Sequence, residues 1–130
     1  MIKSSRHLFM IVLLATLALM IGVKTSVAQD QVEVSPHTYK VLLENDRVRV
    51  LEYRSQPGEK SPMASASEAV IYRLSPSYKL KFTFPDGKTE LVEGKVGDVR
   101  WREEGMVELE NVGNTEAHAV IVELKQPQKK

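Results

Sequence analysis

The chain contains no cysteine, and its first 28 residues contain no acidic residue. The lack of cysteine excludes disulfide bonds, thiolate chemistry and a lipid anchor attached through sulfur. All 17 acidic residues follow residue 28, together with 15 of the 18 lysines and arginines. Residues 29–130 are therefore slightly acidic, and they lack the basic surface that binding to nucleic acid requires.

Residues 8–23 form an apolar run that follows Lys3 and Arg6 and precedes the small residues of Ser26-Val27-Ala28. This order of charged, apolar and small residues is typical of a secretory signal peptide. An uncleaved membrane anchor is the alternative, but sixteen helical residues span only about 24 Å of a bilayer core of about 30 Å. We predict a signal peptide over residues 1–28, cleavage after Ala28, and a periplasmic or secreted protein without a membrane span.

From Tyr39 onward, short segments of β-branched and aromatic residues are separated by glycine, proline, asparagine and aspartate. No stretch has the 3.6-residue period of an amphipathic helix, so the pattern predicts an all-β domain over residues 39–125. Residues 29–38 and 126–130 are predicted to be flexible. The predicted strands cover residues 39–43, 48–54, 69–74, 78–84, 89–93, 99–101, 107–111 and 117–125.

Two of these segments carry the clearest patterns. Residues 78–84 place aromatic and aliphatic side chains on one face and lysines on the other, and Asp86-Gly87 predicts a tight turn into the next strand. Residues 117–125 are apolar on both faces, which favours a central position in a sheet. Because no helix is predicted to cover them, the strands must close on themselves as a small barrel or jelly roll.

Residues 41–125 resemble the small single-domain cupins, whose fold is a double-stranded β-helix or jelly-roll barrel. The resemblance rests on residues 44–50 with Pro57-Gly58-Glu59, on the hairpin at 79–88, on Gly97-Asp98-Val99 and on residues 111–118. It implies a barrel of the same type, and a homodimer, since small cupins commonly pair through their sheets.

Cupins that bind metal hold a divalent ion with imidazoles and one carboxylate that face into the barrel. In this chain the first two histidine positions of the family motif fall on Ala64 and Ala66, and the glutamate position falls on Val70 or Ile71. The last histidine position falls on Val107 or Glu108, depending on which end of the motif is counted from. The ligand set is replaced by small or apolar residues, so we predict no bound metal and no other cofactor.

Few other residues suggest chemistry. His37 lies beside Pro36 near the new N-terminus and is predicted to be a surface residue, and His118 on the last strand is predicted to be a hydrogen-bonded structural histidine. Ser65 and Ser67 have no neighbouring base in the sequence. No catalytic residue is assigned.

The three missing imidazoles leave space inside the barrel for neighbouring side chains, water or a ligand. The leading hypothesis is an exported, non-catalytic module that binds a small molecule or has a structural role. Its candidate pocket residues are Ala64, Ala66, Tyr72, Trp101, Val107 and Glu108.

Two other classes of function stay open. One is a cupin enzyme, either a metal-dependent oxygenase or isomerase with a site rebuilt from Glu68, Glu108 and His118, or a metal-independent isomerase or lyase that uses Tyr72 and an arginine. The other is a protein-interaction module that uses a sheet edge or the lysine face of residues 78–84.

Overall fold

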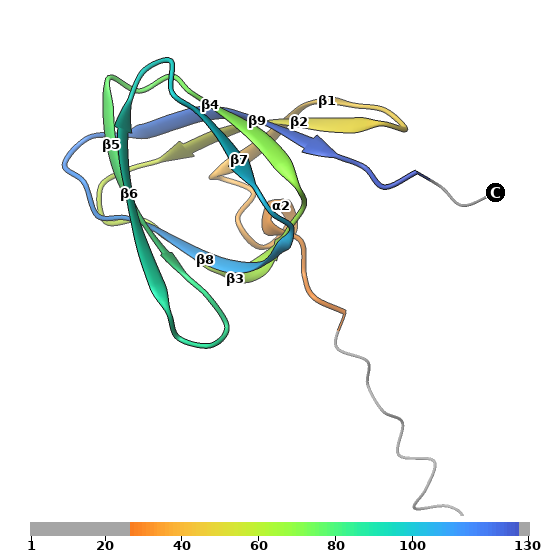
Figure 1. The fold of residues 1–130 in the computed structure, drawn as a ribbon, viewed down its shortest axis with the longest axis horizontal. Coiled ribbons are helices and arrows are strands. Elements are labelled where there is room, and N and C mark those ends of the chain that lie inside the picture. Colours follow the sequence, from red (N-terminus) through yellow and green to blue (C-terminus); the bar gives the residue numbers. More distant parts are fainter. Residues whose placement is uncertain (1–26, 128–130) are drawn as a thin grey trace, which may run out of the picture.

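The computed structural model describes residues 27–127, and within them nine strands form two facing sheets (Figure 1). The five-stranded sheet has the order β1-β2-β9-β4-β7 and the four-stranded sheet the order β3-β8-β5-β6, with antiparallel pairing between the strands. The strands are β1 (Tyr39–Glu44), β2 (Val48–Ser55), β3 (Lys60–Ala66), β4 (Ala69–Arg73), β5 (Ser77–Thr83), β6 (Thr89–Lys95), β7 (Val99–Arg102), β8 (Gly105–Asn111) and β9 (Ala117–Leu124). The predicted all-β jelly roll is confirmed.

The two clearest sequence patterns correspond to the two most regular parts of the barrel. β5 and β6 pair from Ser77 and Lys95 to Thr83 and Thr89, and the turn between them places Gly87 at a φ of 83°. That positive φ favours glycine over other residues. β9 lies at the centre of the five-stranded sheet between β2 and β4, which is the position that its two apolar faces predict.

Strand β3 was not among the predicted strands. Its sequence of proline, alanine and serine has little intrinsic preference for a strand. It becomes a strand because it pairs with β8, and a register shift between Ser61 and Ala64 accommodates the irregularity beside Pro62. Tertiary pairing here decides what local preference does not.

The inward side chains of the five-stranded sheet form three layers across β2, β9 and β4. The layers are Tyr53, Ala119 and Arg73; Leu51, Ile121 and Ile71; and Arg49, Glu123 and Ala69. The middle layer is entirely apolar, and it belongs to the same buried cluster as Leu80 and Phe82 of β5 on the opposite sheet. Polar groups therefore lie at both ends of the barrel, with the hydrophobic core between them.

The segment before β1 differs from the expectation of a flexible arm. It contains the short helix α2 (Gln31–Val34), whose Asp30 side chain accepts a hydrogen bond from the Val32 amide at 2.9 Å. Gln31, Ser35 and Thr38 are buried. Figure 1 shows α2 between the two sheets, and it contacts β1 and β3. A single turn of helix has no periodicity to detect, and its burial depends on distant strands.

The predicted signal peptide lies, except for residues 27 and 28, outside the described residues. Among the residues that are described, no helix has the length and hydrophobicity to cross a bilayer.

Candidate functional site

A cavity of about 290 Å³ opens into the barrel between β7 and the hairpin of β5 and β6. Its interior walls are apolar and come from four strands, and its rim carries charged groups from β6, β7 and the turn after β7. The lining residues are Ala66, Ile71, Phe82, Phe84, Glu90, Arg100, Trp101, Arg102, Glu103, Glu104, Gly105 and Val107.

The apolar walls coincide with the positions that the cupin motif assigns to metal ligands. Ala64 pairs with Val107 across β3 and β8, so both side chains lie on one face of the sheet, and Ala64 and Ala66 are only 2% and 5% exposed. Ile71 faces the same interior from β4. These hydrocarbon side chains offer no nitrogen, oxygen or sulfur atom to a metal. The residues at this site therefore do not fit a bound metal ion.

Arg100 forms one side of the cavity mouth. Its guanidinium carbon lies 5.3 Å from the centre of the Phe82 ring, and its Nη2 is 2.9 Å from Oε1 of Glu90. Both members of this ion pair are partly exposed, and such pairs contribute about 0–1 kcal/mol. Arg100 can therefore exchange Glu90 for another acceptor at low cost.

Arg102 is held more firmly than Arg100. Its Nε and Nη2 donate to the Ser67 carbonyl at 3.0 and 2.8 Å, and Nη2 also donates to Glu123 at 3.0 Å. Burial lowers the pKa of Arg102, while the Glu123 charge acts in the opposite direction. This arginine is part of the scaffold of the cavity.

Trp101 lies at the rim, on the outer face of β7, and is half-exposed. Its Nε1 donates a hydrogen bond of 2.8 Å to Oε1 of Glu103. It is the only tryptophan in the sequence, so the tryptophan fluorescence of the protein comes from the rim of this cavity.

The structure brings some of the predicted pocket residues together and separates others. Ala66, Trp101 and Val107 line the cavity, and Ala64 is buried next to Val107. Tyr72 does not line it, because Ile71 and Arg73 take the inward positions of β4 and alternation turns Tyr72 outward. Glu108 also points out of the barrel, where its carboxylate lies 2.9 Å from Lys60 Nζ.

The alternative metal site does not assemble either. His118 lies on the outer face of β9, with its Nε2 3.0 Å from Oε1 of Glu52, whereas Glu108 belongs to the other sheet. Glu68 sits in the turn between β3 and β4. Nowhere in residues 27–127 do three histidine, aspartate or glutamate side chains gather in a way that could hold a metal ion.

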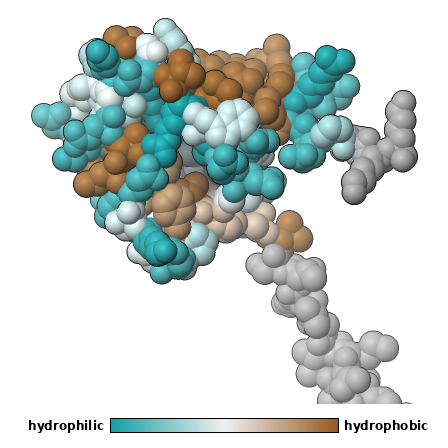
Figure 2. All heavy atoms as spheres, in the orientation of Figure 1, coloured by the Kyte–Doolittle hydropathy of each residue, from teal (hydrophilic) through white to brown (hydrophobic). Residues whose placement is uncertain are grey.

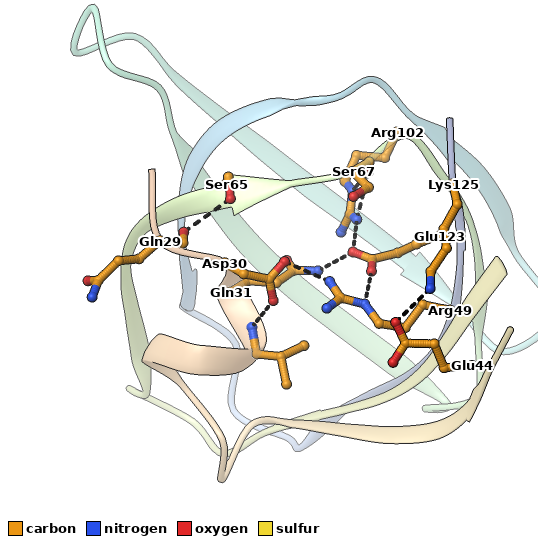
Figure 3. Close-up of polar contacts among 11 residues, drawn as sticks. Gln29, Asp30, Gln31, Glu44, Arg49, Ser65, Ser67, Arg102, Glu123 and Lys125 are labelled. Carbon is orange, nitrogen blue, oxygen red and sulfur yellow. Dashed lines mark hydrogen bonds and ion pairs between the residues drawn. The ribbon is translucent and has the colours of Figure 1, made fainter. Parts of the chain in front are cut away.

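Sequence reasoning missed an ionic cluster that fills one end of the barrel (Figure 3). Glu123 is 1% exposed, and its carboxylate accepts from Arg49 at 2.6 Å, from Gln31 at 2.7 Å and from Arg102 at 3.0 Å. Arg49 also contacts Asp30 at 2.7 Å. Burial alone disfavours the charge of Arg49, but its hydrogen bonds to Asp30 and Glu123 raise its pKa overall. The available signal was a glutamate on the apolar inner face of the last strand.

Arg73 occupies the other end of the barrel interior. It is 2% exposed, and its guanidinium carbon lies 4.3 Å from the centre of the Tyr78 ring. Its Nε has no hydrogen-bond partner among the described residues. Burial lowers the pKa of this arginine, so the stacking on Tyr78 compensates for part of the cost of desolvation.

A second depression, of about 740 Å³, lies outside the barrel near the turn between β8 and β9. It is larger but shallow and open to solvent, and charged side chains such as Lys79, Glu93 and Lys95 line it. The smaller cavity is less open to solvent and is lined partly by core residues, so it is the better candidate for binding a small molecule.

No family model matches the chain, and no curated protein matches it. Solved structures do match. A cupin domain from Bordetella pertussis Tohama I has a TM-score of 0.61 and 27% identity, over 68% of this chain and 92% of that chain. An RmlC-like cupin family protein with a double-stranded β-helix fold, from Methanocaldococcus jannaschii, has a TM-score of 0.56 and 15% identity, over 82% of this chain and 96% of that one.

A cupin superfamily protein from Desulfitobacterium hafniense is also similar, with a TM-score of 0.51 and 13% identity over 68% of this chain and 76% of that chain. These neighbours agree with the residue motifs and with the two facing sheets. The chain is thus a small protein of the cupin fold, a single double-stranded β-helix.

Proposed function

We propose that this protein is an exported, non-catalytic barrel that binds a small, largely apolar molecule in the cavity beside Arg100. One observation carries the proposal: hydrocarbon side chains occupy the positions at which the related fold places metal ligands, and a cavity lies beside them. An apolar cavity with a few polar groups at its mouth is the usual form of a small-molecule site.

The size and rim of the cavity support a particular class of ligand. Its volume of about 290 Å³ is at the lower end of ligand pockets, which favours a compact molecule over an extended chain. Arg100 offers donors at the mouth once it releases Glu90. The ligand we propose has a compact apolar body and one carboxylate or other acceptor group that meets Arg100.

The test uses Trp101 fluorescence with benzoate and benzyl alcohol as matched charged and neutral probes. We expect a saturable change in fluorescence with benzoate, and we expect Ala66→Leu, which fills the cavity, to abolish it. Arg100→Gln should reduce the affinity for benzoate by about tenfold or more and should change the affinity for benzyl alcohol little. Tyr72→Ala, on the outer face, is the control and keeps wild-type affinity.

Two results would overturn the proposal. One is the absence of saturable binding of either probe to the wild-type protein. The other is wild-type affinity in both Ala66→Leu and Arg100→Gln. Circular dichroism checks that the variants are folded, and if Ala66→Leu does not fold, Arg100→Gln decides alone.

The proposal of export rests on the sequence of residues 1–28, and the contacts of Gln29 with the barrel are compatible with cleavage after Ala28. The Gln29 carbonyl accepts hydrogen bonds from the amide and the hydroxyl of Ser65 at 2.8 and 3.1 Å. Cleavage after Ala28 would therefore keep the hydrogen bonds between Gln29 and Ser65. Mass spectrometry of the mature protein is expected to find Gln29 at the N-terminus, and an N-terminus at Met1 would contradict export by this route.

A further inference from the structure

The mouth of the smaller cavity holds a positive and a negative group side by side. Arg100 pairs with the buried Ile71 across β7 and β4. Glu90 pairs with the buried Phe82 across β6 and β5. Because paired residues share one face of a sheet, both charged side chains lie on the barrel side of their strands. Nη2 of Arg100 and Oε1 of Glu90 are 2.9 Å apart.

An apolar pocket begins next to this ion pair. The guanidinium carbon of Arg100 lies 5.3 Å from the centre of the Phe82 ring, and that ring is also part of the cavity wall. The apolar wall continues with Ile71, Phe84 and Val107. Figure 2 shows hydrophobic and hydrophilic residues side by side on the face of the molecule where β7 and the β5–β6 hairpin lie in Figure 1. A ligand in the cavity can therefore meet the two charges and the apolar wall together.

The charges around the mouth are not balanced. Three carboxylates, of Glu90, Glu103 and Glu104, line the cavity together with two arginines. Arg102 already donates to the buried ionic cluster at one end of the barrel. Among the described lining residues, Arg100 is then the one cation left to offset three carboxylates. The mouth therefore has an excess of negative charge.

This excess distinguishes a purely anionic ligand from a zwitterion. A ligand with only a carboxylate takes Arg100 away from Glu90 and leaves the carboxylates of the mouth without a cation. The repulsion among these like charges opposes binding. A ligand that carries an ammonium group next to its carboxylate gives Glu90 a new partner at the moment when Arg100 takes the carboxylate. Each member of the original ion pair then keeps an opposite charge.

We propose that the ligand of this cavity is a free α-amino acid with an apolar side chain, an inference that rests on the binding site proposed above. The ligand carboxylate meets Arg100, its ammonium group meets Glu90, and its side chain enters the apolar cavity. The two charged groups of an α-amino acid are attached to one carbon atom, which matches the adjacency of Arg100 and Glu90. The cavity volume of about 290 Å³ suits one amino acid better than a peptide.

The donors and acceptors at the mouth suit both charged groups of such a ligand. A guanidinium binds a carboxylate through two parallel hydrogen bonds, and an ammonium group has three donors for carboxylate oxygens. Glu103 lines the same cavity, and its Oε1 accepts the hydrogen bond from Trp101 Nε1 at 2.8 Å. An ammonium group at this mouth therefore changes the electrostatic surroundings of the Trp101 indole, which makes fluorescence a suitable readout.

The test compares three probes of matching shape by Trp101 fluorescence and by calorimetry. They are L-phenylalanine, 3-phenylpropanoate, which lacks the ammonium group, and 2-phenylethylamine, which lacks the carboxylate. We expect L-phenylalanine to bind about tenfold more tightly than either of the other two. If 3-phenylpropanoate binds as tightly as L-phenylalanine, the inference is overturned while the apolar binding site stands. If none of the three probes binds, both the inference and the binding site are refuted.

A variant of Glu90 separates the two charged contacts. Glu90→Gln should weaken the binding of L-phenylalanine by about tenfold. It should leave the affinity for 3-phenylpropanoate unchanged or higher, because Arg100 no longer has a carboxylate partner in the protein. Glu93→Gln is the matched control on the outer face of the same strand, where Glu93 pairs with Lys79 at 3.0 Å, and it should change neither affinity. An equal loss of affinity for both probes in Glu90→Gln would overturn the inference.

Discussion

Removal of the Glu123 carboxylate should destabilise the barrel more than any surface charge change. This side chain is almost fully buried, and three residues, Arg49, Arg102 and Gln31, donate hydrogen bonds to it. Glu123→Ala would leave two guanidinium groups without their shared acceptor. Breaking a buried ion pair by deleting one partner costs about 3–5 kcal/mol, and each kcal/mol lowers the Tm of a domain of this size by about 4–8 °C.

The assay is urea unfolding of the mature protein, followed by circular dichroism, with two comparison variants. Glu123→Gln keeps the shape and some of the hydrogen bonds, so its cost should be smaller, about 1–3 kcal/mol. Glu116→Ala removes the exposed partner of Arg54 and should cost about 1 kcal/mol or less. If Glu123→Ala lowers the free energy of unfolding by less than about 1 kcal/mol, water already reaches the cluster and this reasoning is refuted.

A double-mutant cycle sharpens the test. Because Arg102 donates to Glu123 and to the Ser67 carbonyl, Arg102→Met should cost less in the Glu123→Ala background than in the wild type. The difference measures the coupling between the two charges. Additive costs would mean that they act independently.

Three further outcomes are expected. The hydrogen bond from His118 lowers the pKa of Glu52. The stabilisation from the Glu52 carboxylate is therefore present near neutral pH and lost as pH falls through the lowered pKa. NMR titration should show that the pKa of Glu52 is higher in His118→Asn than in the wild type. Burial raises the pKa of Tyr53 to about 12, so spectrophotometric titration of Tyr53→Phe should show one late-ionising phenol fewer than the wild type. An unchanged number of late-ionising phenols would mean that the Tyr53 ring is exposed. Gly94→Ala would push a Cβ into the Asp98 carboxylate and the Tyr78 hydroxyl, so thermal melts should show a loss of about 1–3 kcal/mol, of which Tyr78→Phe restores a part. The absence of a loss would mean that both side chains move aside freely.

The amino-acid sequence determined the fold class and much of the strand pattern. Alternation along residues 78–84 and the Asp86-Gly87 turn are local features, and they define the β5–β6 hairpin without help from the rest of the chain. The apolar character of both faces of residues 117–125 likewise predicted the central strand, which the structure places at β9. The replacement of ligand positions by Ala64 and Ala66 was also readable from the sequence alone.

Only the tertiary structure decided which side of each strand faces the barrel. Tyr72 and Glu108 point outward because the pairing register of β4 and β8 sets the phase of alternation, and a sequence motif does not fix that phase reliably. A shift of one position exchanges the inner and outer faces. For this reason the structure moves Tyr72 from the candidate pocket to the outer face of the sheet.

The ionic cluster and the N-terminal helix depend on contacts that are far apart in the chain. Glu123 meets Gln31, 92 residues away, and Arg49, 74 residues away. No local pattern predicts these contacts, because they form only when the barrel has closed and its first and last segments lie at the same end. The sequence thus specified most of the strands, and the packing of the two sheets specified β3, the cavity, the buried charges and which side chains face outward.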